Sequence, residues 1–180
     1  MAILKVARLG HPILRQKAEP MTRSQVRSAE IQRLIDDMIE TLHEYEGVGL
    51  AATQVHMLVR LALVEVPAGE EREAVALTVL VNPNVTPLGD ERVYGYEGCL
   101  SLPDLRGVVP RQRRVRLEAL DRQGRPFELE AEGFLARVIQ HECDHLEGVT
   151  FVDRMDDLRT LSFLREFERH VGLETGPIED

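Results

Sequence analysis

A His-Glu-x-x-His sequence, "HECDH" at His141–His145, sets the strongest limit on how this chain can fold. It lies in a stretch with helical spacing, Gly133–Leu146, and a helix turns by about 100° per residue. The two histidines therefore point the same way, about 40° apart, and Glu142 lies about 100° round from the first. All three side chains project from the apolar side of the predicted helix, so the fold has to accommodate them in its interior.

A buried glutamate between two histidines needs an explanation, because burial of a carboxylate is costly unless its charge is compensated. A divalent cation bound by the histidines would compensate it, and this spacing on a helix is a specific signal for such a site. A buried arginine would do the same, and the motif would then be structural. In a catalytic site, the metal lowers the pKa of a bound water, and Glu142 can carry the water proton to a leaving group.

A catalytic tetrahedral site also needs a third protein ligand. The acids downstream of the helix do not supply an obvious one, since Glu147 is on the wrong face and the later aspartates have no geometry that the sequence fixes. Cys143 points away from the histidines and is expected to pack in the core. Cys99, in the loop-like stretch "YEGCLSLP", could reach the helix across the core, although a buried free thiol explains its position equally well.

The opposite arc of the predicted helix is polar. It holds Arg137, Gln140, Asp144 and Glu147. Asp144 faces away from the metal, so we expect it to pair with a basic residue, such as Arg111, that fixes the helix. Arg111 belongs to the basic stretch "PRQRRVR", which is interpreted as a solvated strand face.

The composition excludes several classes of protein. The chain has 180 residues, 43% of them hydrophobic and 29% charged, which is typical of a soluble protein with a single domain over 1–180. A net charge of −9 and the absence of Trp argue against a general nucleic-acid surface. No apolar run reaches the roughly 18 residues of a membrane-spanning helix, and the N-terminus has no signal-peptide pattern. A cytoplasmic protein is expected, or an organelle protein whose transit segment was removed.

Hydrophobic spacing predicts an α+β domain with one helix, then strands, then helices. The first helix is expected from Ile31 to a stop at Gly47, and the last one over about 157–171. The expected strands are Leu58–Val66 and Ala74–Asn82, with the turn "AGEE" between them, and the hairpin of Arg113–Leu120 and Pro126–Glu132, joined by Asp121–Gly124.

The glycine-containing stretch "GVGLAATQV" (Gly47–Val55) follows the first predicted helix. It lacks the Lys and Ser/Thr of a phosphate-binding loop, and no strand precedes it, so a nucleotide site is not expected. The side-chain amide of Gln54 could donate a hydrogen bond to a developing oxyanion. Taken alone, a surface glutamine is the simpler interpretation of this residue.

Three stretches, "GVGLAATQ" (Gly47–Gln54), "EGCLS" (Glu97–Ser101) and "HECDH", closely resemble in this order the three signature motifs of peptide deformylase. The resemblance extends from Leu4 to about Asp153 and includes "LGHPILR" near the start of the chain and "QHECDHLEG" around the third motif. It implies an α+β fold with mixed, mainly antiparallel sheets around a central helix that carries the metal histidines.

The resemblance also implies an activity, which is removal of the formyl group from the N-terminal formyl-methionine of newly made polypeptides, with release of formate. It assigns the metal ligands to Cys99, His141 and His145, and the general acid/base to Glu142. Gln54 and the backbone N–H of Leu100 would stabilise the oxyanion while metal-bound hydroxide attacks the formyl carbon.

An apolar pocket for the methionine side chain is implied by the same resemblance. The helix geometry places Phe134 and Val138 beside His141, and the first motif adds Val48, although ordinary core packing explains these residues too. Gly49 could offer backbone hydrogen bonds to the peptide. Arg106 falls where the family carries an arginine near the substrate, and Glu97 is a candidate partner for one ligand histidine.

A thiolate with two imidazoles suits one zinc ion, but also Fe(II), Co(II) or Ni(II). The resemblance implies iron as a common native metal, which would make the site oxygen-sensitive because Cys99 can be oxidised. N-formyl-methionyl nascent peptides are the implied partners, with no specific nucleic acid and no membrane. A transient ribosome contact through the C-terminal segment is a weak inference, because the charges of that segment are mixed.

Three other interpretations of the motifs remain open from the residues alone. A zinc endopeptidase with a His-Glu-x-x-His helix would cleave internal peptide bonds and would need a third ligand downstream. A non-catalytic metal-binding module would use Glu142 as a buried structural acid. A metal-free structural domain would purify without metal and stay stable in chelator.

Overall fold

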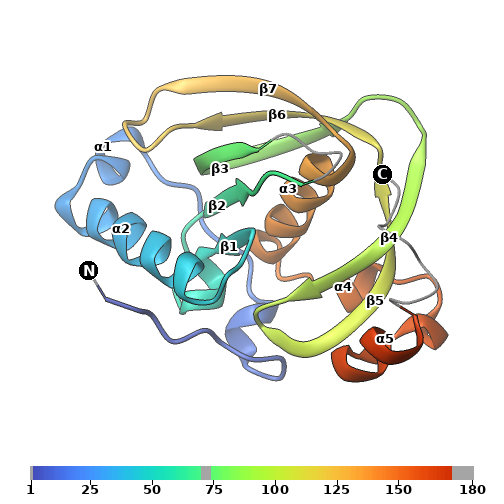
Figure 1. The fold of residues 1–180 in the computed structure, drawn as a ribbon. Coiled ribbons are helices and arrows are strands. Elements are labelled where there is room, and N and C mark those ends of the chain that lie inside the picture. Colours follow the sequence, from blue (N-terminus) through green and yellow to red (C-terminus); the bar gives the residue numbers. More distant parts are fainter. Residues whose placement is uncertain (1, 70–73, 172–180) are drawn as a thin grey trace.

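The structure is a computed structural model, which describes residues 2–69 and 74–171. The order of its main elements is that of an α+β protein, as predicted (Figure 1). The helices are α1 (Arg23–Val26), α2 (Ala29–Glu44), α3 (Gly133–Leu146), α4 (Phe151–Arg154) and α5 (Leu164–His170). The strands are β1 (Gly49–Ala51), β2 (Leu61–Val66), β3 (Val75–Pro87), β4 (Arg92–Cys99), β5 (Leu102–Gln112), β6 (Arg114–Leu120), β7 (Pro126–Glu132) and β8 (Ser162–Phe163).

Within the described residues, the strands form two sheets. One is five-stranded with the order β1-β2-β3-β6-β7, and the other is three-stranded with the order β4-β5-β8. Each pair of neighbouring strands is antiparallel, and within residues 2–69 and 74–171 a parallel contact occurs only as an isolated bridge between Glu19 and Val59. The helix α3 contacts strands of both sheets and lies in the middle of the molecule (Figure 1). The predicted central helix is thus confirmed.

Burial of one apolar side explains the position of α3. Ala136, Ile139 and Leu146 are buried in a cluster with residues of the five-stranded sheet, such as Val64 and Leu117. Because these residues are three and seven positions apart, they share one side of the helix, and packing them against the sheet removes apolar surface from water. The sheet therefore fixes which side of α3 remains for the histidines.

The opposite face of the five-stranded sheet is covered by α2. Its N-terminus is capped by Ser28, whose side chain accepts a hydrogen bond from the backbone N–H of Ile31. The buried residues Ile35, Met38 and Leu42 pack in a cluster with strand residues of this sheet. This is the first helix predicted from the sequence. The first glycine-containing motif, Gly47–Gln54, follows it in the chain.

Several predicted boundaries were wrong. β2 begins at Leu61 rather than at residue 58, and β3 continues to Pro87 through an irregularity in its pairing with β6. The predicted "AGEE" turn lies partly outside the described residues. The hairpin of β6 and β7 is confirmed, with Arg114 paired to Glu132.

The C-terminal helix predicted over about 157–171 is shorter in the structure. Leu158–Thr160 form a 3-10 turn, β8 follows at Ser162–Phe163, and α5 begins only at Leu164. The reason is tertiary, because β8 adds to the edge of β5, with Phe163 opposite Leu105. Helical spacing in this segment is therefore overridden by strand pairing. No helix among the described residues is both long and apolar enough to cross a membrane.

Candidate active site

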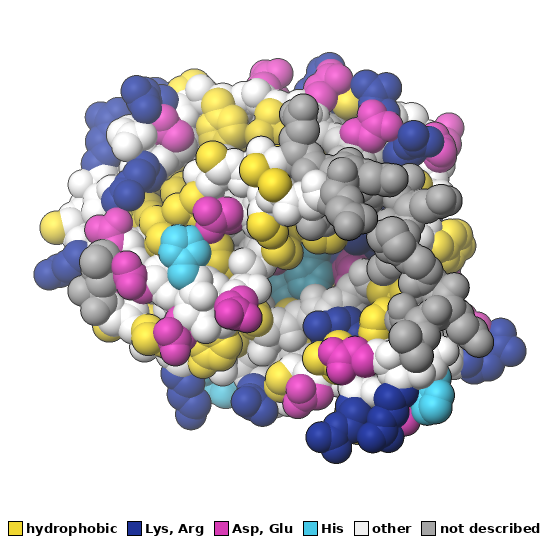
Figure 2. Space-filling view, viewed as in Figure 1, with side chains coloured by type: hydrophobic (Ala, Val, Ile, Leu, Met, Phe, Trp, Pro, Cys, Tyr) yellow, Lys and Arg dark blue, Asp and Glu magenta, His cyan; other side chains and the backbone are white. Residues whose placement is uncertain are grey.

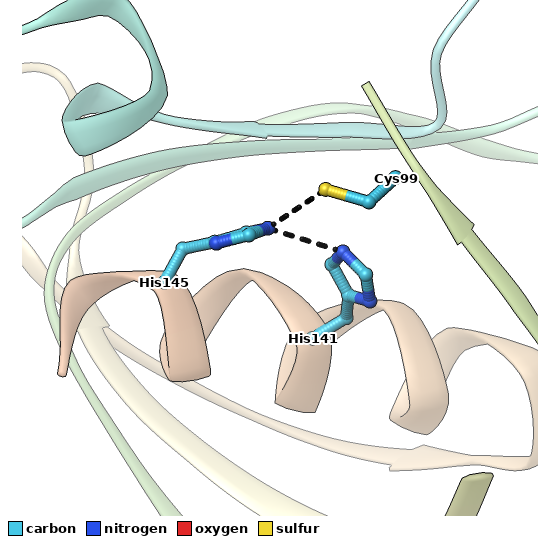
Figure 3. Close-up of side chains that lie close together, drawn as sticks. All are labelled: Cys99, His141 and His145. Carbon is cyan, nitrogen blue, oxygen red and sulfur yellow. Dashed lines mark hydrogen bonds between the residues drawn. The ribbon is translucent and has the colours of Figure 1, made fainter. Parts of the chain in front are cut away.

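Cys99, His141 and His145 meet at the side of α3 that faces the second sheet (Figure 3). Cys99 is the last residue of β4, so it lies at a strand end and not in a loop as the sequence suggested. Its Sγ lies 3.1 Å from Nε2 of His145, and that nitrogen lies 3.2 Å from Nε2 of His141. One ligand atom of each residue lies within 4.8 Å of the others. The three side chains can therefore hold one metal ion.

The electrostatics of this group favour a thiolate. Burial alone would raise the pKa of Cys99, but the charge of His145 and hydrogen bonds to both imidazoles lower this pKa well below its ordinary value. Burial alone would lower the pKa of His141, and its contacts with Cys99 and Glu97 raise it well above the ordinary value. A buried thiolate beside two imidazoles is a donor set for a divalent cation, which displaces protons from these groups when it binds.

Glu97 orients one of the histidines, as the sequence analysis suggested. Its Oε2 lies 2.8 Å from Nδ1 of His141. This contact leaves Nε2 of the imidazole directed at Cys99 and His145, the arrangement usual for a metal-binding histidine. Hydrogen bonds from His141 and Arg111 outweigh burial and lower the pKa of Glu97 below its ordinary value. Glu97 is therefore ionised at neutral pH.

The predicted pair of Asp144 and Arg111 is confirmed. Nη1 of Arg111 donates to Oδ2 of Asp144 at 2.5 Å, and Nε donates to Oε1 of Glu97 at 2.8 Å. Arg111 is 5% exposed, so it is not part of a solvated face as expected for its basic stretch. The nearby Arg113 and Arg116 are on the surface and pair with exposed glutamates, which agrees with that expectation.

Glu142 is 4% exposed and lies against the backbone of Gly49. A Cβ on Gly49 would be 2.6 Å from Cδ of Glu142, so a side chain there would displace the carboxylate. Among the described residues, Oε2 of Glu142 has no hydrogen-bond partner. Burial raises the pKa of Glu142 to about 7. Such a group can both accept and return a proton near neutral pH.

Gln54 is 1% exposed, which excludes the interpretation as a surface glutamine. Its Oε1 accepts a hydrogen bond from the backbone N–H of Ala51 at 2.8 Å. This fixes the amide orientation, so that Nε2 donates to Oγ of Ser101 at 3.1 Å and approaches Sγ of Cys99 at 3.5 Å. Leu100, the residue that follows Cys99, lines a cavity that also reaches Gln54 and Cys99. Gln54 and Leu100, the two residues predicted to supply the oxyanion donors, therefore both lie beside Cys99.

A cavity of about 510 Å³ opens next to the candidate ligands. Figure 2 shows it as a hollow with a histidine side chain at its floor. The five residues predicted to bind the substrate all line it: Val48, Gly49, Arg106, Phe134 and Val138. Phe134 and Val138 also pack against the main core cluster, so the pocket and core interpretations both hold for them. The guanidinium of Arg106 lies over Gly98, where a Cβ would be 2.5 Å from its Cζ.

The sequence analysis did not place Arg137 or Leu164 in the cavity wall. Arg137 was assigned to the polar arc, but it lies one turn before His141, on the same side of α3, and lines the cavity. Leu164 of α5 also lines it, because the C-terminal segment is attached to β5 through β8. Next to it, the ring of Phe167 contacts Tyr96 at a centroid distance of 4.6 Å. The sequence signal that could have placed the C-terminal segment against the cavity was the apolar pair of Leu164 and Phe167, three residues apart.

A family model described as polypeptide deformylase matches residues 3–160. The chain belongs to this family. A peptide deformylase of Chromohalobacter salexigens is 45% identical over 169 residues, which are 94% of this chain and 95% of the relative. Peptide deformylase 2 of Pseudomonas putida is 43% identical over 164 residues, 89% of this chain and 92% of the relative.

Solved structures of the family are similar as well. A class I type b peptide deformylase of Acinetobacter baumannii, bound to Met-Ala-Ser, is 39% identical with a TM-score of 0.79 and covers 86% of this chain and 99% of its own. The peptide deformylase of Ehrlichia chaffeensis is 30% identical with a TM-score of 0.81 and covers 88% and 91%.

Membership of this family indicates which reaction the chain catalyses. Peptide deformylases are metal-dependent hydrolases that remove the N-terminal formyl group from nascent peptides, and the group of Cys99, His141 and His145 is the candidate metal site of this chain. The zinc endopeptidase, the non-catalytic module and the metal-free domain are set aside by this membership.

Proposed function

We propose that this chain deformylates N-formyl-methionyl peptides with one divalent metal ion held by Cys99, His141 and His145. The observation that carries the proposal is the meeting of these three ligand atoms within 4.8 Å beside the buried carboxylate of Glu142. The whole chain, 1–180, forms the catalytic unit.

The donor set fits such a metal. A thiolate and two imidazoles suit Fe(II), Zn(II), Co(II) or Ni(II), and Fe(II) is proposed as the native ion. When bound, such an ion would supply Lewis acidity and would lower the pKa of the attacking water. Support comes from the orientation of His141 by Glu97, because a ligand imidazole needs its second nitrogen occupied in this way.

Glu142 acts as the general acid/base. Its carboxylate takes the proton of the attacking water and passes it to the leaving amine, so that formate and a free N-terminus result. Its pKa of about 7 suits both transfers near neutral pH. The tight fit against Gly49 keeps the carboxylate in place. Because Oε2 has no hydrogen-bond partner among the described residues, it is available to accept the proton.

Gln54 and the backbone N–H of Leu100 stabilise the oxyanion that develops on the formyl oxygen. The bond from Ala51 to Oε1 supports this role, since it directs the donor side of the Gln54 amide toward Cys99. A donor that is fixed before the reaction needs no rearrangement when the charge develops.

The methionine side chain occupies the apolar part of the cavity, against Val48, Phe134 and Val138. Gly49 offers backbone hydrogen bonds to the peptide, and Arg106 lies beside the bound chain. The Met-Ala-Ser peptide bound by the Acinetobacter baumannii relative supports a peptide in the corresponding cavity.

Newly made polypeptides as substrates place this enzyme where translation occurs, and we propose the cytoplasm. A ribosome contact through α5 would be transient, since Arg165 and Arg169 of this helix are interleaved with Glu166 and Glu168. No specific nucleic-acid contact is proposed.

The test is formate release from a formyl-Met-Ala peptide by anaerobically purified protein, with metal content determined in parallel. Glu142→Gln should retain metal and lose about 10²- to 10⁴-fold in kcat, because proton transfer is lost while the ligands remain. Glu147→Gln, a change on the outer side of the same helix end, is the matched control and should keep full activity. Formate release by Glu142→Gln at the wild-type rate would refute the role of Glu142, and no formate from the wild type would refute the function.

A further inference from the structure

Arg137 connects the helix of the candidate site to both strands of the facing hairpin. Its Nη1 donates to Oε1 of Glu97 at 2.9 Å and to the carbonyl of Val109 at 2.8 Å. The same nitrogen lies 3.3 Å from the carbonyl of Gly95, and Nη2 donates to the carbonyl of Val93 at 2.8 Å. The Arg137 side chain is 11% exposed, so these bonds form in a nearly dry place.

The metal ligands come from two separate parts of the fold. His141 and His145 are on α3, whereas Cys99 ends β4 of the hairpin. Arg137 precedes His141 by one helical turn and bonds to β4, to β5 and to Glu97. One guanidinium thus bonds the helix that carries the imidazoles to both strands of the hairpin that carries the thiol, in addition to the links made by Arg111 and Gln140.

Gly95 forms a seat for this guanidinium. A Cβ on Gly95 would be 2.8 Å from Nη2 and 3.0 Å from Cζ of Arg137. Gly95 is not among the described glycines with positive φ, so its backbone does not require a glycine. The absent side chain is explained by the close approach of the guanidinium.

The remaining partners of Glu97 show why Arg137 is not needed simply to neutralise it. Arg111 donates Nε to Oε1 and Nη2 to Oε2 of Glu97, a bidentate contact. Removal of the Arg137 charge therefore leaves Glu97 paired, and the site retains a compensated carboxylate. What Arg137 adds is a planar fork that reaches several acceptors at once, which a lysine cannot reproduce.

We propose that Arg137, seated on Gly95, is a positioning residue that sets the separation of the Cys99 thiolate from the two imidazoles and thereby the metal affinity. The inference rests on the proposed function, since it requires that these three side chains hold a metal. Partners that orient ligands in this indirect way typically change metal affinity by about 10- to 100-fold when they are removed.

The test measures Co(II) affinity by competition with a chelator, following the thiolate-to-cobalt absorbance, on proteins with native circular dichroism. Arg137→Met should lose at least about ten-fold in affinity. Gln140→Met is the matched control, because Gln140 ties the same helix to the backbone of Gln112 on β5 but does not contact Glu97. The control should bind cobalt with an affinity close to that of the wild type.

Gly95→Ala provides a second variant in case Arg137→Met fails to fold. Its added methyl group should displace the guanidinium and weaken cobalt binding, less than Arg137→Met does. Combined with Arg137→Met it should weaken binding no further, because its effect acts through the guanidinium.

Equal affinities of Arg137→Met and Gln140→Met, or an additive loss in the double variant, would overturn this inference alone. Should Arg137→Met not fold, wild-type affinity in Gly95→Ala would overturn it. A wild-type chain that shows no thiolate-to-cobalt absorbance would overturn the proposed function, and this inference with it.

Discussion

The carboxylate of Glu142 lies directly on the backbone of Gly49, so closely that a Cβ on this glycine would be 2.6 Å from Cδ of Glu142. The glycine comes from the first motif and the glutamate from the third, and both line the cavity. Gly49 is not among the described glycines with positive φ. Its lack of a side chain therefore serves the position of the carboxylate rather than a turn.

Gly49→Ala should consequently act as a catalytic variant and not as a folding variant. The methyl group displaces the Glu142 carboxylate, and we expect kcat to fall on the order of 10²-fold, the lower range for loss of general acid/base catalysis. Metal content and thermal stability should stay near the wild-type values. Steady-state kinetics with a formyl-Met-Ala peptide check this, and an unchanged kcat would show that the carboxylate tolerates the displacement.

Arg111→Leu should destabilise the fold strongly. Arg111 is buried between Glu97 and Asp144, and its removal leaves two buried carboxylates with fewer partners. A broken buried ion pair costs about 3–5 kcal/mol in free energy of unfolding. Urea denaturation of the wild type and of Arg111→Leu measures the difference in free energy of unfolding. Arg154→Leu is the comparison, since Arg154 also bonds Asp144 but is half exposed and should cost much less.

Asp153→Asn should reveal a pH-dependent contribution at the start of α4. Hydrogen bonds from Arg15 and from the backbone and side chain of Thr150 outweigh burial and lower the pKa of Asp153. Its charge therefore stabilises the folded state above the unfolded pKa of about 3.9, and this stability is lost as the pH falls through the folded pKa.

The melting temperature of Asp153→Asn should accordingly lie below that of the wild type at pH 7, and the two should converge as the pH falls below about 4. The pair with Arg15 is partly exposed, so a gap of a few degrees at most is expected. A gap that is constant from pH 7 to pH 3 would assign the effect to packing and not to charge.

Leu164→Ala should affect substrate binding more than turnover. Leu164 lines the cavity from the C-terminal segment, and loss of apolar contact in a pocket raises KM on the order of ten-fold while the reacting groups stay in place. Phe163→Ala is the matched control, because Phe163 is 66% exposed and is not among the residues that line the cavity. Equal KM values for the two variants would contradict a role of Leu164 in the pocket.

The local part of this site was predictable because a helix is built from contacts within four residues. The spacing of His141 and His145 places both imidazoles on one side of α3 in any fold that forms this helix. The apolar steps of α2 and the alternation of β6 and β7 are local in the same sense, and the structure confirms these elements.

The position of Cys99 could not be derived from spacing. It lies 46 residues before His145, and their contact depends on how the hairpin of β4 and β5 packs against α3. The residue pattern alone left the role of Cys99 open, and only the resemblance of the motifs to a known family identified it as a metal ligand. Strand pairing also decided the segment before α5, where a 3-10 turn and β8 stand in place of the first part of the helix expected over about 157–171.

The sequence by itself determined the helix that carries both histidines and, through the resemblance of its three motifs to a known family, the candidate residues of the site. Only the tertiary structure decided what holds them together. β4 was missed because Gly95 and Gly98 weaken its strand pattern, and both glycines are places where the guanidinium of Arg137 or Arg106 lies on the backbone. The contact of Arg137 with Gly95 joins residues 42 positions apart in the chain. Its physical cause is the close approach of two packed elements, which leaves no periodic signal along the sequence.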